Sequence, residues 1–160
     1  MHLVTQLLKN IILPMAIVLL SAGCHAPEGY HAFRTLPVEG WTRGDTLCFA
    51  LPRQAHTVSC RATIEIRHTG RYPYRSLWLL VSHNTTDSLQ FRTDTIECAL
   101  TDAHAHFDGT GVNDLYQKSF PLSPMTLKAG TSPIIRVVPF MKDRFLPGIT
   151  DIGVRLTPAP

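Results

Sequence analysis

The densest group of side chains that could bind a metal ion lies between residues 101 and 114. His104 and His106 are two positions apart, and Asp102 and Asp108 flank them. Residues i and i+2 of an extended segment point the same way, so both imidazoles could share one zinc ion, with an aspartate as a further ligand. The spacing matches no established zinc motif and includes no cysteine. These four residues are therefore a candidate metal site, with an exposed polar loop as the simpler interpretation.

Signatures of catalysis are missing from the sequence. It contains no Gly-x-Ser-x-Gly nucleophile elbow, no glycine-rich phosphate loop and no Cys, His and Asn order of recognisable spacing. Asp94 and Glu97 are three positions apart, so on a regular strand they point to opposite faces and cannot act as a glycosidase pair. We predict that the protein is not an enzyme and needs no cofactor.

The segments that must position these residues are patterned as β-strands. Apolar and polar residues alternate over residues 47–51 and 62–66, which is typical of half-buried strands. Residues 77–81 are continuously apolar, which predicts a strand covered on both faces. Further strands are expected over residues 91–100, 115–120, 134–138 and 149–156, and a turn-rich loop over 101–113.

Proline and glycine punctuate the chain, and no long amphipathic helix interrupts it. About eight short strands at this spacing predict a single antiparallel β-sandwich, immunoglobulin-like or jelly-roll-like, over residues 30–160. The formal net charge is +3 and the basic residues are scattered singly. This pattern does not suggest a nucleic acid partner.

The first two dozen residues have the pattern of an export signal. Lys9 precedes an apolar run over residues 11–20, which is too short to span a bilayer, and Ser21, Ala22 and Gly23 lead to Cys24. This predicts a cleaved lipoprotein signal peptide (residues 1–23), lipidation of Cys24 and a short tether (residues 24–29). Ordinary secretion with cleavage by the general signal peptidase is the alternative.

Three cysteines remain once Cys24 is set aside, so at most one internal disulfide can form. Cys60 shares its strand parity with Ile64, and Cys98 shares its own with Ile96, so both are expected to face the core. A Cys60–Cys98 disulfide is a candidate. Two buried free thiols are the alternative, since cysteine is often buried without a bond.

Several sequence blocks occur in a characteristic order. Tyr30, Phe33, Trp41 and Asp45 come first, followed by Ile64-Glu65-Ile66-Arg67, by Tyr72-Pro73-Tyr74 leading into Leu77-Trp78-Leu79, and by Asp94-Thr95-Ile96-Glu97. The block over residues 146–156, LPGITDIGVRL, is the most specific. Together they resemble the GldH type of gliding-motility lipoprotein of the Bacteroidetes, over nearly the whole mature chain. The chain departs from the family pattern at His104, His106 and Phe107.

The resemblance implies an envelope lipoprotein that is a non-catalytic component of a gliding-motility or type IX secretion assembly. Residues 25–28 lack the acidic run that sends many lipoproteins of this bacterial group to the cell surface, so we expect the protein at the outer membrane, facing the periplasm. Its expected partners are other envelope proteins, and its expected contact with the membrane is the acyl anchor, including palmitate, on Cys24. The alternative function is a glycan- or peptidoglycan-binding module. The candidate partner or ligand surface comprises Trp41, Tyr72, Tyr74, Asp151 and Arg155. Asp151 and Arg155 are expected to point outward because they alternate with Ile152 and Val154, and a solvated strand face is the simpler interpretation of these two residues.

Overall fold

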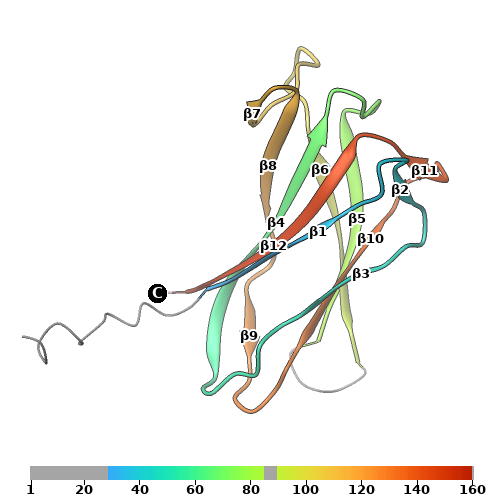
Figure 1. Cartoon of the computed structure of the whole chain (residues 1–160). Helices are drawn as coiled ribbons and strands as arrows, with labels where there is room; N and C mark the ends of the chain where they lie inside the picture. The colour runs from blue at the N-terminus through green and yellow to red at the C-terminus, as the bar shows by residue number, and fades with distance from the viewer. Residues whose placement is uncertain (1–28, 85–89, 160) are drawn as a thin grey trace, which may run out of the picture.

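The computed structural model describes residues 29–84 and 90–159, and every regular element in them is a β-strand (Figure 1). No helix in these residues could cross a membrane. The predicted signal peptide, Cys24 and the tether up to residue 28 lie outside the described residues. All strand pairs are antiparallel, which confirms the predicted all-β antiparallel class.

The strands form two main sheets and one small ribbon. The large sheet has the order β1 (Tyr30–Thr35), β12 (Ile149–Pro158), β4 (Val58–Thr69), β8 (Leu115–Pro121) and β7 (Thr110–Val112), and β9 (Met125–Leu127) also pairs with β4. The small sheet has the order β3 (Leu47–Ala50), β10 (Ile134–Pro139), β5 (Ser76–His83) and β6 (Arg92–Ala99). The corner ribbon pairs β2 (Trp41–Thr42) with β11 (Phe145–Leu146).

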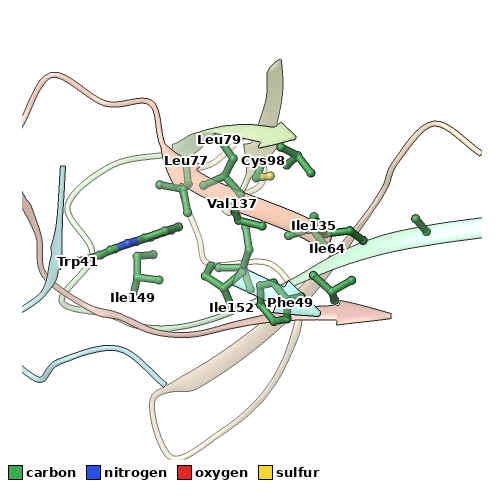
Figure 2. Close-up of a cluster of buried hydrophobic side chains, with 14 of the residues drawn as sticks. Trp41, Phe49, Ile64, Leu77, Leu79, Cys98, Ile135, Val137, Ile149 and Ile152 are labelled. Atoms are coloured by element: carbon green, nitrogen blue, oxygen red, sulfur yellow. The ribbon is translucent and has the colours of Figure 1, made fainter. Parts of the chain in front are cut away.

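The inner faces of both main sheets supply one hydrophobic core (Figure 2). Alternation along β4 and β12 turns one side of each strand inward, where the two strands contribute Ile64, Ile66, Ile152 and Val154. The small sheet supplies the opposing apolar layer. Its fully buried members are Phe49, Leu77, Leu79, Cys98, Ile135 and Val137. This arrangement agrees with the predicted sandwich, because the period-2 pattern buries one face of each sheet.

The strand formed by the continuous apolar run at residues 77–81 is covered on one face only. Leu77, Leu79 and Val81 are buried, but Trp78 is 39% exposed and Leu80 is only half-buried. The expectation of a strand covered on both faces was therefore wrong. Only the inner side of the small sheet has a packing partner, so an apolar residue on its outer side meets solvent.

The predicted loop over residues 101–113 contains a short strand as well as turns. β7 pairs with β8 from Thr110 opposite Gln117 to Val112 opposite Leu115. Asn113 and Asp114 both have positive φ, of 50° and 64°. Two consecutive residues in this conformation make the tight turn that joins the strands of a hairpin.

The beginning and the end of the domain lie together. Tyr30 at the start of β1 pairs with Leu156 near the end of β12, whereas Thr35 at the end of β1 pairs with Asp151. β1 therefore runs away from the chain ends and toward the corner ribbon, which Figure 1 shows on the other side of the molecule from the C-terminus.

Candidate interaction surfaces

The outer face of the large sheet brings together two sequence blocks that are far apart in the chain. β4 pairs with β12 so that Glu65 lies opposite Gly153, and Arg67 lies opposite Asp151. β1 pairs with the other side of β12, which places Phe33 opposite Gly153. The block over residues 64–67 and the block over residues 146–156 therefore build one surface.

Glu65 is the centre of this surface. Its side chain is only 1% exposed, although it is on the side of β4 that faces away from the core. The carboxylate accepts a hydrogen bond from Nε2 of His31 at 2.8 Å and forms an ion pair with the guanidinium of Arg155. A buried carboxylate needs such partners, because without them the cost of leaving water is not offset.

Phe33 covers this network from the side of β1. A Cβ on Gly153 would lie 2.6 Å from the Phe33 ring, so the ring occupies the place of a β12 side chain. The guanidinium carbon of Arg67 lies 3.8 Å from the centre of the same ring, and Arg67 Nε donates to Gln117 Oε1 at 2.8 Å. The stacking of arginine on an aromatic face is favourable and fixes the side chain.

Of the candidate surface residues, Arg155 belongs to this network, and Asp151 makes a separate contact between β12 and β1. Thr35 Oγ1 donates to Asp151 Oδ1 at 2.7 Å, and Arg155 pairs with Glu65. Their predicted outward orientation is confirmed, since the intervening Ile152 and Val154 are buried. Because their charges already have partners within the chain, they hold strands β1, β4 and β12 together.

The aromatic candidates divide between core and surface. Trp41 is 0% exposed and its Nε1 donates to the carbonyl of Asp45 at 3.3 Å, and Tyr72 is 2% exposed with its hydroxyl donating to the carbonyl of Ser76 at 3.0 Å. Burial raises the pKa of Tyr72. The prediction that Trp41 and Tyr72 belong to a ligand surface was therefore wrong, because both rings fill the core. Tyr74 is 36% exposed.

An aromatic groove opens at the corner of the small sheet, where Tyr74 meets two residues that the sequence analysis did not select. Trp78 is 39% exposed and Phe140 is 58% exposed. The Phe140 amide donates to the Trp78 carbonyl at 2.8 Å, which places their backbones side by side. The groove has a volume of about 630 Å³ and is completed by Arg43, Met141, Lys142 and Asp143.

The polar groups of the groove are arranged by contacts within the chain. The Tyr74 hydroxyl donates to the Asp143 carboxylate, and this hydrogen bond raises the pKa of Tyr74. Arg43 Nη1 donates to the carbonyl of Lys142 at 3.0 Å. Strand alternation places Trp78 on the opposite face from the core residues Leu77 and Leu79. The sequence does not reveal this outward position, because every residue from 77 to 81 is apolar and no polar residue marks the exposed face.

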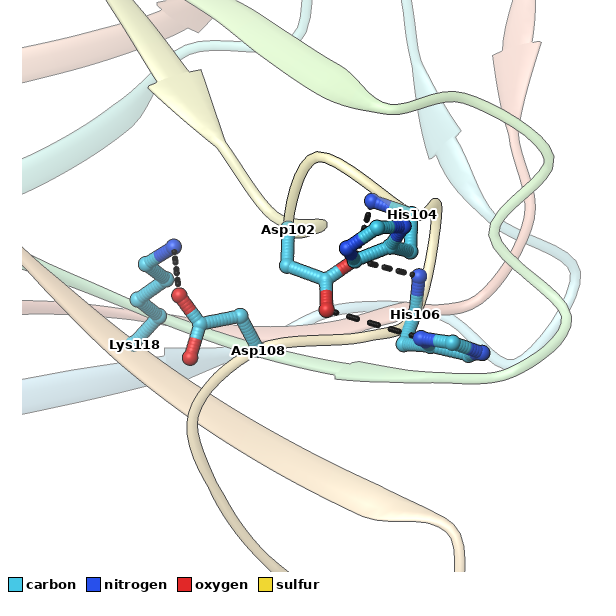
Figure 3. A network of polar contacts seen from close by, with 5 residues as sticks. All are labelled: Asp102, His104, His106, Asp108 and Lys118. Carbon is cyan, nitrogen blue, oxygen red and sulfur yellow. Dashed lines mark hydrogen bonds and ion pairs between the residues drawn. The ribbon is translucent and has the colours of Figure 1, made fainter.

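The candidate metal site forms a compact turn (Figure 3). Asp102 Oδ1 accepts hydrogen bonds from the amides of His104 and His106, at 2.8 and 2.9 Å, and these bonds lower the pKa of Asp102, that from His106 most. Ala105 has a φ of 64°, so the segment is not extended and the premise of a shared metal ion was wrong.

Asp108, the other candidate aspartate ligand at this loop, forms an ion pair with Lys118. Lys118 Nζ contacts Asp108 Oδ2 at 2.8 Å, whereas Asp102 lies 3.5 Å from His106 Nδ1 (Figure 3). Within residues 29–84 and 90–159, no group of three or more His, Cys, Asp or Glu side chains is placed to hold a metal ion.

His68 is a buried titratable group that sequence reasoning missed. It is 0% exposed, and its Nε2 has no hydrogen-bond partner in the described chain. Its ring stacks on Tyr116 at a centroid distance of 5.4 Å and contacts Phe107 at 5.0 Å. Burial lowers the pKa of His68, which favours the neutral form of the ring.

The two buried cysteines are free thiols, which contradicts the candidate disulfide. Cys60 lies eight residues before His68 on β4, a distance of about 26 Å along a strand. Cys98, however, lies at the His68 end: it is opposite Leu77 of β5, and the neighbouring Ser76 carbonyl accepts a hydrogen bond from Tyr72, whose ring contacts His68. A disulfide requires Cα atoms within about 7 Å, so the strand geometry keeps the thiols apart.

Comparison with models of known protein families assigns this domain to a family. A family model described as GldH lipoprotein matches residues 28–156, which is most of the chain and every strand except the last two residues of β12. The chain belongs to the GldH lipoprotein family. The surface around Glu65 and the aromatic groove are thus both features of a GldH lipoprotein domain.

Two solved structures resemble this chain at low sequence identity and low TM-score. A structure of Eiger TNF from S. frugiperda shares 10% identity over 81% of this chain and 91% of its own, with a TM-score of 0.39. The infectious bursal disease virus VP2 subviral particle shares 12% identity over 83% of this chain and 34% of its own, with a TM-score of 0.29. Among curated proteins, none matches the chain.

Membership of the family confirms the resemblance read from the sequence blocks and supports a gliding-motility-associated lipoprotein of the cell envelope. The predicted lipidation residue, Cys24, precedes the matched segment and lies outside the described residues. Its acylation therefore stays a prediction.

Proposed function

We propose that this protein is an outer-membrane lipoprotein, anchored through acylated Cys24 and facing the periplasm, that acts as a non-catalytic component of a gliding-motility or type IX secretion assembly. The family match over residues 28–156 is the observation that carries this proposal. Its partners are other envelope proteins.

The position of the chain ends is consistent with a membrane tether. β1 begins at Tyr30, and a tether from Cys24 to residue 29 spans at most about 20 Å when extended. Acyl chains contribute about 0.8 kcal/mol per buried methylene, so two or more hold the domain at the membrane. The corner ribbon and the aromatic groove would then face away from the bilayer, because β1 leads from the tether toward them.

The test is purification of the tagged full-length protein from detergent-solubilised envelope after crosslinking in intact cells, with Cys24→Ala as the control. We expect motor or secretion components to copurify with the wild-type chain and to be reduced with Cys24→Ala. Recovery of none of these proteins with either chain would contradict the assembly role. Protease digestion of intact cells tests the location, and removal of the protein would contradict a periplasmic orientation.

The aromatic groove supports a second candidate function, which is the binding of a glycan such as peptidoglycan. Tyr74, Trp78 and Phe140 expose aromatic rings beside the cationic groups of Arg43 and Lys142. Sugar rings stack on aromatic faces, and a few polar groups fix their orientation. If this function is correct, purified peptidoglycan sacculi should sediment the wild-type domain, while Trp78→Ala should remain in solution. Equal sedimentation of the two proteins would refute it.

A further inference from the structure

β6 forms an open edge of the small sheet. It pairs with β5 in unbroken register, from Arg92 opposite His83 to Ala99 opposite Ser76. Within the described chain, no strand pairs with its other side. An edge strand presents a row of backbone N–H and C=O groups without ladder partners, so β6 offers eight residues of free strand edge.

The other edges of the described sheets are shorter or lie beside another strand. β7 has three residues and β3 has four. β1 has six, but the side chain of Arg34 reaches across and donates from Nε to the carbonyl of Cys48 on β3 at 3.3 Å. The two sheets thus approach each other on the β1 and β3 side. On the opposite side, β6 is the longest exposed edge.

The side chains of β6 suit pairing with another strand. Thr93, Thr95 and Glu97 are exposed on the outer face, while Cys98 is buried and Ile96 packs against the core. Threonine and isoleucine favour the extended conformation. β6 contains no proline, lysine or register shift, which are devices that protect a free edge, and its one device of this kind is an inward-pointing charge at Asp94.

One acidic side chain restricts which strand could pair there. Asp94 occupies a core-side position of β6, is 32% exposed and lies 3.7 Å from Arg92 Nε. A charge at such a position disfavours pairing with an uncharged strand. An incoming strand that places a lysine or arginine opposite Asp94 would instead gain electrostatic complementarity.

We propose that β6 binds an extended segment of a partner envelope protein by β-strand addition. Only a polypeptide can match the alternating donors and acceptors of a strand edge, so neither a glycan nor a lipid fits this surface. The partner segment is rich in β-branched residues and carries a basic residue opposite Asp94. This inference rests on the proposed assembly role, because it names the surface through which a partner would be held.

The experiment places the photo-crosslinking residue p-benzoylphenylalanine in the full-length tagged chain, in intact cells, at Thr93, Thr95 or Glu97. Thr63 and Thr157, on the outer face of the large sheet, are the control positions. Strand addition predicts adducts from all three β6 positions to alternate residues of one segment of one motility or secretion protein, with few adducts from the controls. Adducts to unrelated positions, to a second copy of this chain or to glycan would overturn the inference.

A charge reversal provides an independent measurement. Asp94→Lys should reduce the copurified partner at least about tenfold, because like charges would then face each other across the new ladder. Glu39→Lys, an exposed site away from β6, should not reduce it. Equal thermal denaturation of both variants shows that folding is intact. If the wild-type chain recovers partners and Asp94→Lys recovers them equally, the strand-addition inference fails and the assembly role stands. If the wild-type chain recovers none, both fail.

Discussion

Gly153 of β12 lies directly beneath the ring of Phe33 from β1, so that a Cβ on Gly153 would come within 2.6 Å of Phe33 Cε1. The ring in turn lies under the guanidinium of Arg67 from β4. Because Gly153 has no side chain, the Phe33 ring from β1 and the Arg67 guanidinium from β4 can stack above β12 on the outer face of the large sheet.

Gly153→Ala should lower the free energy of unfolding by about 1–3 kcal/mol, because the added methyl group must displace the Phe33 ring. Urea denaturation of the domain measures this change. In a Phe33→Ala background the same substitution should cost much less, since the clashing ring is gone. Equal costs in the two backgrounds would show that Gly153 is needed for another reason.

Glu65→Gln should destabilise the domain by about 1–3 kcal/mol. The amide keeps the size of the carboxylate but removes the charge that balances Arg155 at a buried position and that accepts a hydrogen bond from His31. Glu39→Gln is the matched control, because Glu39 is exposed. Chemical denaturation at constant pH compares the two variants, and similar midpoints would contradict a structural role for the Glu65 network.

His68 should make stability depend on pH. Burial lowers its pKa in the folded protein below the ordinary value of 6.5. Between these two pKa values the unfolded chain binds more protons than the folded one. Stability is therefore complete above about pH 6.5 and is lost as the pH falls below it, by at most about 1.4 kcal/mol per pH unit.

The measurement for His68 is the unfolding free energy between pH 7.5 and pH 5. His68→Phe should reduce the slope, since phenylalanine keeps the stacking on Tyr116 but cannot be protonated. A remaining slope of the same sign is expected from His83, whose pKa burial also lowers. His56→Gln, a substitution at an exposed histidine, is the matched control variant. An unchanged slope in His68→Phe would contradict this assignment.

The three described thiols should differ sharply in reactivity. Cys48 is exposed, whereas burial raises the pKa of Cys60 and raises that of Cys98 to about 12. Because the thiolate is the reactive form, a chain beginning at His25 should show one fast thiol with Ellman's reagent and two more after denaturation. Cys48→Ser should remove the fast reaction. Only one titratable thiol after denaturation would indicate a disulfide instead.

Local patterns in the sequence were sufficient to predict most long strands. The alternation at residues 62–66 predicted the centre of β4, and the run at residues 149–156 predicted most of β12, because burial of one sheet face imposes a period of two on each strand. The short strands β2, β7, β9 and β11 were not predicted. Segments of two or three residues carry too little periodicity and form only where a partner strand already lies beside them.

For the candidate surface residues, the sequence predicted orientation along a strand but not contacts between strands. Asp151 and Arg155 were correctly oriented by alternation along one strand, but their partners, Thr35 and Glu65, come from other strands. Trp41 and Tyr72 were expected on the surface, and both are in the core. An aromatic residue beside a turn suits either place, and its burial depends on which elements pack against it.

The sequence by itself determined the family, the antiparallel β class and the inward or outward direction of side chains along the alternating strands β4 and β12, because these depend on local order and spacing. Only the tertiary structure decided that Glu65 is buried with Arg155 and His31, that the buried thiols are far apart, and that β6 is left as an open edge. These features depend on strand order and register. Antiparallel pairing can join segments from opposite ends of a chain, and no local pattern specifies which two will meet.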